Sequence, residues 1–128
     1  MTDPVLLDTD VVIDYLRNRP AAITFVESLP SKPLLSVITV AELYRGVRDG
    51  KERTELDHLI ANSRVLLLDL PAAVAGGLHQ RQFGKSHGVG FADAMISAIA
   101  LQHNLTLITL NKKHFPTLTD LVVPYLKP

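Results

Sequence analysis

The 128-residue chain has the length of one domain, and with 47% hydrophobic residues it can bury a single core. It contains no cysteine, which excludes disulfide scaffolds, thiol nucleophiles and thiolate metal sites. Its 13 Lys and Arg residues balance its 13 Asp and Glu residues, so the net charge gives no argument for a nucleic-acid partner.

The first apolar run of the chain ends in acidic residues. The stretch "VLLDTDVVIDYL" predicts a buried strand over Val5–Asp8 and a helix from Val11, with Asp10 as the helix N-cap. No basic region precedes this run, and no segment approaches the roughly 18 apolar residues that span a bilayer, so we expect a cytoplasmic protein that contacts no membrane. An unpaired buried carboxylate is costly, so Asp8 needs a ligand or a neutralising partner.

Five apolar runs predict β-strands. They are continuous in Val, Leu and Ile, as in parallel strands covered on both faces: Val5–Asp8, Leu34–Ile38, Val65–Leu70, Leu105–Leu110 and Leu121–Tyr125. The segments between them have helical periodicity: Val11–Arg17, Ala21–Leu29, Val40–Arg48, Glu52–Asn62, Pro71–Phe83 and Phe91–His103. This alternation predicts one α/β domain over residues 1–128, with a mostly parallel five-stranded sheet flanked by helices.

Polar residues from separate parts of the chain are predicted to meet at one edge of this sheet. The carboxyl ends of parallel strands and the N-termini of the following helices share that edge. Asp8 ends the first strand, Glu42 follows the second, Asp93 begins the Ala-rich helix and Asn111 follows the fourth strand. Oxygen ligands without His or Cys suit Mg²⁺ or Mn²⁺. Such an ion would relieve the repulsion between the acids and could activate a water molecule.

Several of these residues also have plainer interpretations. Thr39 and Glu42 fit a capping box, and Asp93 could complement the dipole of its helix. Asp69 also ends a predicted strand, but a turn role is favoured because Pro71 follows it. Of the five histidines, only His114 is a candidate for a functional contact.

Two segments carry basic residues close to the predicted site. Arg45 and Arg48 lie one and two turns beyond the predicted helix start, and Lys112 and Lys113 follow Asn111. Basic side chains in these positions could contact the phosphate groups of a substrate. We name these four residues as candidate substrate contacts.

Four motifs along almost the whole chain carry a family resemblance. They are "LLDTDVVIDYL", "SVITVAELYRGV", "GVGFADAMISAIAL" and "LTLITLNKKHF", in this order. The chain resembles the PIN-domain ribonucleases and, among them, the VapC toxins of toxin–antitoxin systems. The resemblance implies a metal-dependent endoribonuclease that uses Mg²⁺ or Mn²⁺, is held inactive by a cognate antitoxin protein, and is typically a homodimer.

The resemblance also implies roles for individual residues. The family's first three acids fall on Asp8, Glu42 and Asp93, and its fourth falls on Asn111. Many relatives carry an acid at this fourth position or three residues later, where this chain has His114. Asn111 brings an oxygen but no negative charge, which bears on whether a second metal binds. Asp10 stands where relatives often have Asn.

Two other classes of protein remain as alternatives. In a receiver-type signalling domain, Asp8 and Asp10 would hold Mg²⁺ and Asp69 would accept a phosphoryl group, but Glu42 and Asp93 would have no role. A catalytically dead PIN-like binding module would keep the fold and the antitoxin contact without the chemistry.

Overall fold

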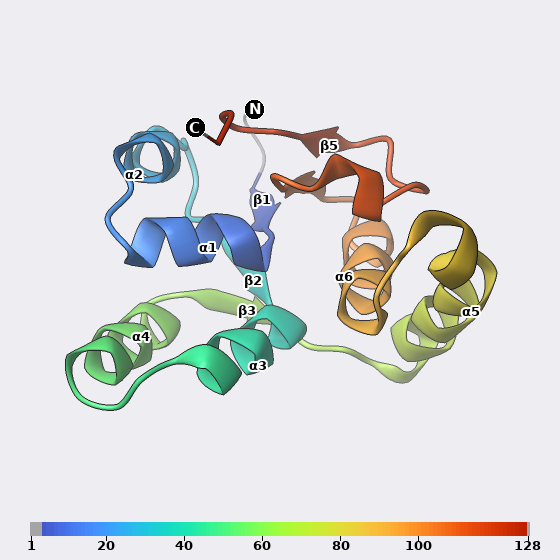
Figure 1. The fold of residues 1–128 in the computed structure, drawn as a ribbon, viewed down its shortest axis with the longest axis horizontal. Helices are drawn as coiled ribbons and strands as arrows, with labels where there is room; N and C mark the ends of the chain where they lie inside the picture. Colours follow the sequence, from blue (N-terminus) through green and yellow to red (C-terminus); the bar gives the residue numbers. More distant parts are fainter. Residues whose placement is uncertain (1–3, 128) are drawn as a thin grey trace.

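The computed structural model describes residues 4–127; residues 1–3 and 128 of the predicted domain lie outside the described residues. The chain alternates strands with helices throughout (Figure 1). The elements in order are β1 (Val5–Leu7), α1 (Thr9–Leu16), α2 (Pro20–Glu27), β2 (Leu34–Ser36), α3 (Val37–Gly46), α4 (Lys51–Ala61), β3 (Arg64–Leu66), α5 (Leu70–His87), α6 (Phe91–Gln102), β4 (Thr106–Ile108), the 3-10 turn η1 (Lys112–His114) and β5 (Leu121–Val122). Within residues 4–127, no helix is both long and apolar enough to cross a membrane.

The five strands form one sheet in the order β3-β2-β1-β4-β5, and every neighbouring pair is parallel. Leu6 in the central strand pairs with Leu34 of β2 and Leu107 of β4. This confirms the predicted α/β class and the parallel five-stranded sheet. The strands are shorter than predicted, and the polar residues at the ends of the apolar runs lie in the following loops and helix starts.

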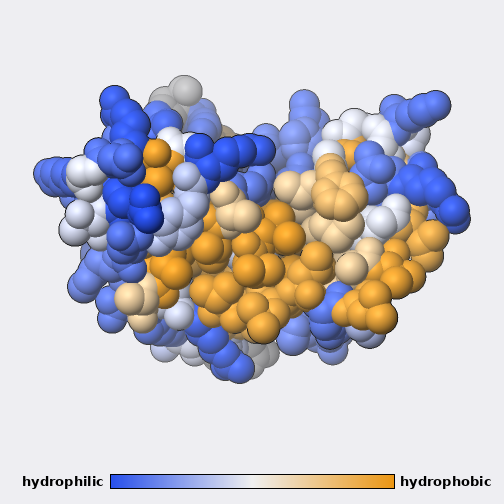
Figure 2. Space-filling view, turned by 90° about the horizontal axis from the view of Figure 1, so that it is seen from below, coloured by the Kyte–Doolittle hydropathy of each residue, from blue (hydrophilic) through white to orange (hydrophobic). Residues whose placement is uncertain are grey.

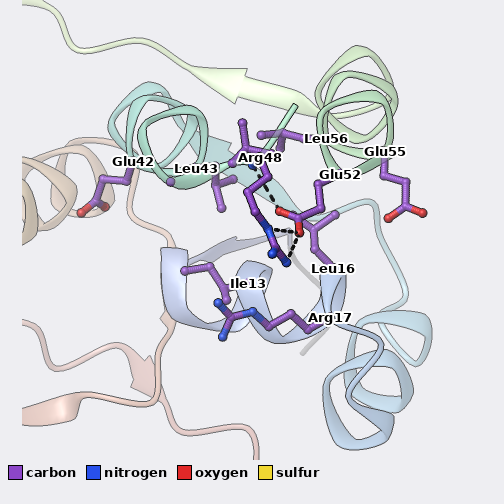
Figure 3. Close-up of a pocket in the computed structure, with 11 residues that line it drawn as sticks. Ile13, Leu16, Arg17, Glu42, Leu43, Arg48, Glu52, Glu55 and Leu56 are labelled. Atoms are coloured by element: carbon purple, nitrogen blue, oxygen red, sulfur yellow. Dashed lines mark hydrogen bonds and ion pairs between the residues drawn. The ribbon is translucent and has the colours of Figure 1, made fainter. Parts of the chain in front are cut away.

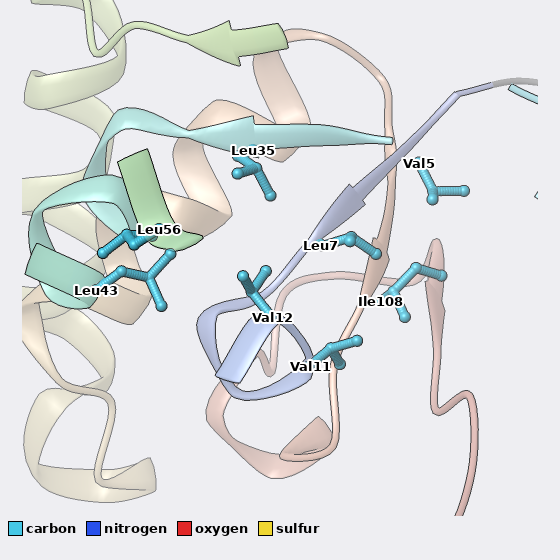
Figure 4. Close-up of a cluster of buried hydrophobic side chains, with 8 residues drawn as sticks. All are labelled: Val5, Leu7, Val11, Val12, Leu35, Leu43, Leu56 and Ile108. Atoms are coloured by element: carbon cyan, nitrogen blue, oxygen red, sulfur yellow. The ribbon is translucent and has the colours of Figure 1, made fainter. Parts of the chain in front are cut away.

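Each face of the sheet has its own core, because alternate residues of a strand point to opposite faces. Figure 1 shows α1 to α4 on one side of the sheet and α5 and α6 on the other. Leu7 of β1 and Ile108 of β4 pack with Val11 of α1 and with residues of α3 and α4 (Figure 4). On the opposite face, Leu6 packs with Ile96 of α6. The central strands are therefore covered on both faces, which explains their continuous apolar sequence.

A buried ionic cluster attaches the C-terminal segment to α1. Asp14 is 1% exposed and accepts a hydrogen bond from the Tyr125 hydroxyl at 2.9 Å. Arg19 Nε lies 3.1 Å and Lys127 Nζ 3.7 Å from its Oδ1. Burial, followed by the hydrogen bond to Asp14, raises the pKa of the Tyr125 hydroxyl. The tail after β5 is thereby held beside the first helix of the domain.

Helix α5 packs on α6 rather than on the sheet, and one glycine sets their distance. A Cβ at Gly76 would lie 2.7 Å from Met95 Sδ and 3.3 Å from the Ala94 carbonyl oxygen, whereas a Cβ at Gly77 would have no atom within 4 Å. The close approach of the two helices therefore depends on the missing side chain at residue 76.

We expect Gly76→Ala to be less stable than Gly77→Ala by about 1–3 kcal/mol, because the new methyl group must displace Met95 in a packed core. Gly77→Ala is the matched control, since it brings the same gain in helix propensity at an open position. Chemical denaturation of both variants measures the difference. Equal unfolding midpoints would contradict the close contact.

Candidate active site

Asp8 lies at the centre of the predicted edge, directly after β1. It is 5% exposed, and its two carboxylate oxygens accept hydrogen bonds from the Thr9 backbone N–H at 2.8 Å and from the Thr109 hydroxyl at 2.7 Å. Its extended backbone makes it the N-cap of α1. The prediction that Asp10 caps this helix at Val11 is wrong, because β1 ends at Leu7 and the helix begins two residues earlier.

The pKa of Asp8 is raised from its ordinary value of 3.8 to about 7. Burial is the largest cause, followed by the negative charge of Asp10; Asp93 adds a smaller effect in the same direction. The hydrogen bonds from Thr109 and Thr9 favour the ionised form but do not offset these effects. A cation beside Asp8 would stabilise the ionised carboxylate and so offset the cost of burying its charge.

Asp10 lies in the first turn of α1 and contacts the loop after β4. Its Oδ1 accepts from the Val11 N–H at 2.8 Å, while its Oδ2 accepts from the Leu110 N–H and from Asn111 Nδ2, both at 3.0 Å. Burial raises its pKa, and the backbone hydrogen bonds lower it. Asn111 is exposed, and its side-chain amide donates to Asp10.

Glu42 lies in the second turn of α3, and the predicted capping box with Thr39 is wrong. Ser36 is the N-cap of α3, and its Oγ accepts from the Thr39 N–H at 3.0 Å. Glu42 instead accepts from the Thr9 hydroxyl at 2.7 Å. The Thr39 hydroxyl lies 2.9 Å from that of Thr9 and 3.3 Å from that of Ser36. Because Thr9 has one hydroxyl proton and a carboxylate can only accept, Thr39 donates to Thr9 when Glu42 is ionised.

These hydroxyl groups were missed as site residues by the sequence reasoning. Thr9, Ser36 and Thr109 each lie at the end of a strand or within two residues of it, and their side chains orient the groups around Asp8 and Glu42. The signal available in the sequence is the polar residue that closes each apolar run: "LLDT", "LLSV" and "LIT".

Asp93 lies in the first turn of α6, and the imidazole of His114 lies beside it. His114 Nδ1 is 3.3 Å from Asp93 Oδ2, and the two side chains are 35% and 25% exposed. The pKa of Asp93 is raised, chiefly by burial; His114 lowers it, while the charges of Glu42 and Asp10 raise it. The acids of α1, α3 and α6 therefore act electrostatically on one another, as their predicted convergence requires.

The donor set fits a hard divalent cation in its chemistry. The carboxylates of Asp8, Asp10, Glu42 and Asp93 supply oxygen ligands. Burial, and to a lesser degree the neighbouring acids, raises the pKa of Asp8 and Asp93, and a cation beside them would stabilise their ionised forms. Within residues 4–127, however, no three Asp, Glu or His side chains are gathered so that they could hold one ion as they stand. Asp8, Asp10 and Glu42 accept hydrogen bonds from hydroxyl and amide groups instead, and Asp93 lies beside His114, so the carboxylates would have to rearrange to ligate one ion together.

A hollow of about 470 Å³ adjoins the site between α1, α3 and α4. Figure 3 shows Glu42 at one side of it, with Arg17, Arg48 and Glu52 across it. Arg48 is held by Glu52, with Nη2 2.6 Å from the carboxylate, and this pairing lowers the pKa of Glu52. The other candidate RNA contacts are exposed: Arg45 in the last turn of α3, and Lys112 and Lys113 of η1.

Asp69 has a structural role, but at a helix start rather than in a simple turn. Its Oδ1 accepts from the Ala72 N–H at 3.0 Å as the N-cap of α5, and its Oδ2 accepts from Gln102 Nε2 at 2.7 Å. These bonds lower its pKa. With both oxygens engaged, Asp69 is poorly placed to accept a phosphoryl group.

The raised pKa of Asp8 predicts a pH-dependent stability of the metal-free protein. The folded state binds a proton at Asp8 more tightly than the unfolded state does, so stability falls as the pH rises from about 4 to about 7. In chelator at pH 8, we expect Asp8→Asn to be more stable than the wild type by up to about 4 kcal/mol, and this gain to vanish near pH 4. Urea unfolding at both pH values measures it, with the exposed Asp49→Asn as the charge control. A constant difference across this range would show that the Asp8 carboxyl is not perturbed.

Comparison with known proteins identifies the family. The model of the PIN domain family matches residues 5–119. Ribonuclease VapC10 of Mycobacterium tuberculosis is 37% identical over 127 residues, covering 97% of this chain and 95% of the relative. In a toxin–antitoxin complex from Klebsiella pneumoniae, one chain superposes with a TM-score of 0.82 at 25% identity, covering 96% of this chain and 99% of that one.

A second solved structure agrees with this assignment. A chain of FitAcB from Neisseria gonorrhoeae superposes with a TM-score of 0.73 at 32% identity, covering 94% of this chain and 97% of that one. The match of the family model and these nearly full-length relatives confirm the resemblance seen in the sequence: the chain belongs to the PIN domain family, among relatives named VapC ribonucleases.

Proposed function

We propose that this chain is the toxin of a type II toxin–antitoxin system and acts as a divalent-metal-dependent endoribonuclease, using Mg²⁺ or Mn²⁺. The observation that carries this proposal is the buried carboxylate of Asp8, whose pKa is raised beside the acids of α1 and α6 at the carboxyl edge of a PIN-domain sheet. The relative named as a ribonuclease covers almost the same length. In this proposal residues 1–128 act as one catalytic domain.

The chain's own residues would divide the work as follows. Asp8 and Asp93 would hold the ion together with Glu42, whose carboxylate is positioned by the Thr9 hydroxyl. A bound divalent ion lowers the pKa of a water molecule and stabilises charge on a phosphoryl group. Asn111, in the loop after β4, would bring a side-chain oxygen to the site without adding negative charge. The Thr109 hydroxyl, which donates to Asp8 Oδ2, would keep the Asp8 carboxylate oriented.

RNA is the proposed substrate, reached through basic side chains around the site. Lys112 and Lys113 lie next to Asn111 and are exposed, as is Arg45, so they can contact phosphates directly. Arg48 must first leave Glu52 or share its guanidinium with it, so we expect it to contribute less. A cellular RNA substrate would place the protein in the cytoplasm.

An antitoxin is the proposed protein partner, supported by the similarity to chains of solved toxin–antitoxin complexes. The hollow beside Glu42 suits a partner segment, since its lining combines apolar residues of α1, α3 and α4 with charges of both signs. A segment in this hollow would restrict the access of RNA to Glu42.

A homodimer is proposed from the apolar face of the molecule. Figure 2 shows a broad region of hydrophobic side chains on the face seen from below. Leu67, Leu70, Val74 and Leu78, along the β3–α5 connection and α5, are 71%, 77%, 54% and 49% exposed. Monomeric proteins rarely leave such large apolar side chains contiguous and exposed. A second copy of this chain would cover them.

We expect Leu70→Glu to convert the protein to a monomer, because a buried unpaired carboxylate opposes association. Light scattering after size exclusion measures the mass. Leu101→Glu is the control, since Leu101 is an exposed residue near the end of α6. A Leu70→Glu variant that stays dimeric would place the interface elsewhere.

The proposed activity is tested with purified protein and a mixed RNA pool, in Mg²⁺, Mn²⁺ or chelator. We expect cleavage in the presence of either ion and none in chelator. Asp93→Asn should lower cleavage about 100-fold or more, since one carboxylate of the site is lost. Asp120→Asn, which changes an exposed Asp that accepts from the Thr106 hydroxyl, should retain activity.

The same preparations separate the alternatives. If the wild type cleaves no RNA but metal raises its melting temperature, the metal site is real and the RNA pool lacks the right substrate. If metal has no effect on the melting temperature, the chain is a binding module without activity. A receiver-type domain would gain an acid-labile aspartyl phosphate from a small phosphodonor, which we do not expect given the engaged oxygens of Asp69.

A further inference from the structure

Asp10 joins two parts of the chain that are far apart in sequence. Its carboxylate belongs to the first turn of α1, yet it accepts hydrogen bonds from the Leu110 N–H and from the side-chain amide of Asn111, 100 and 101 residues away. The proposed metal binding uses Asp8 and Asp93 and leaves the function of this bridge open.

The bridge requires a carboxylate at residue 10 and a donor at residue 111. Three N–H groups converge on the Asp10 carboxylate, from Val11, Leu110 and Asn111. An amide at residue 10 would turn its own N–H₂ toward at least one of these donors. An acid at residue 111 would bring a second carboxylate to the position of an amide nitrogen that now lies 3.0 Å from Asp10 Oδ2. The two residues are therefore complementary.

The bridge continues to the buried Asp8. The Asn111 backbone N–H donates to the Thr109 hydroxyl at 3.0 Å, and that hydroxyl donates to Asp8 Oδ2 at 2.7 Å. Thr109 is fully buried. The position of residue 111 thus determines where the Thr109 hydroxyl points, and the hydroxyl determines the orientation of Asp8. Hydrogen bonds in such a chain strengthen one another.

We propose that Asp10 and Asn111 form one positioning pair, which fixes the loop after β4 and, through Thr109, the orientation of the Asp8 carboxylate. The functional importance of this pair rests on the proposed metal-dependent activity, whereas its structural effect does not. The pair also explains why an Asn occupies residue 111: an acid there would face the Asp10 charge.

A double-mutant cycle tests the pair: Asp10→Asn, Asn111→Asp and the two combined, with Asp120→Asn as control. In the combined variant, the amide N–H₂ introduced at residue 10 can donate to the new carboxylate, so the side-chain bond between residues 10 and 111 is restored with reversed polarity. The Leu110 N–H loses its acceptor, because in the wild type it shares Asp10 Oδ2 with the Asn111 amide. The first readout is made in chelator: hydrogen exchange of the backbone amides of residues 110 and 111, and the carboxyl ¹³C shift of Asp8. The second is the Mn²⁺ dissociation constant from calorimetry.

We expect each single substitution to speed exchange at Leu110, to move the Asp8 carboxyl resonance, and to weaken Mn²⁺ binding about 10–100-fold. The combined variant should bind Mn²⁺ more tightly than Asn111→Asp and return the Asp8 resonance toward its wild-type position, while exchange at Leu110 stays fast. The control should match the wild type. Tighter Mn²⁺ binding by Asn111→Asp alone, or purely additive effects in the combined variant, would overturn the proposal. If the wild type bound no Mn²⁺, the proposed function would fall, while the exchange and ¹³C measurements in chelator would still decide whether the pair orients Asp8.

Discussion

The burial of one carboxylate, Asp8, is the constraint on which the site depends. The residue directly follows the central strand, where both faces of the sheet are covered, so its charge is poorly solvated. Two hydrogen bonds, from Thr9 and Thr109, hold it without neutralising it. The negative charges of Asp10 and Asp93 make ionisation of Asp8 still less favourable. A domain folded only for stability would place an apolar or amide side chain there, and this cost is what supports the proposed cation.

The parallel sheet gathers these groups without any local motif. Because all five strands run the same way, the residues after β1, β2 and β4 share an edge, and the helices that follow β1 and β2 begin there. Short polar side chains at the strand ends then orient the longer acids: Thr9 holds Glu42, and Thr109 holds Asp8. The acids thus occupy defined positions even though none of them lies in a rigid cluster of ligands.

Much of the fold could be predicted from the sequence, because continuous Val, Leu and Ile runs mark strands that are covered on both faces. The meeting of Asp8, Glu42 and Asp93 followed from topology alone, although their roles in binding a metal stay predictions. The helix caps were harder, since a cap depends on the residue at which a strand ends, and the true caps are Asp8 and Ser36 rather than Asp10 and Thr39. The contacts of Asp10 with residues 110 and 111 could not be predicted, because nothing local marks a partner 100 residues away.

The distance in sequence between Asp8 and Thr109 has a consequence during synthesis. The two residues are 101 positions apart, and the strands that carry them are neighbours in the middle of the sheet. A growing chain on the ribosome contains Asp8 long before the hydroxyl that orients it, which arrives only with the loop after β4. Until then the central strand lacks a neighbour on one side, and its acid lacks one of its two donors. The site therefore forms only after β4 and the following loop have been made, and a nascent chain that stops before β4 cannot assemble it.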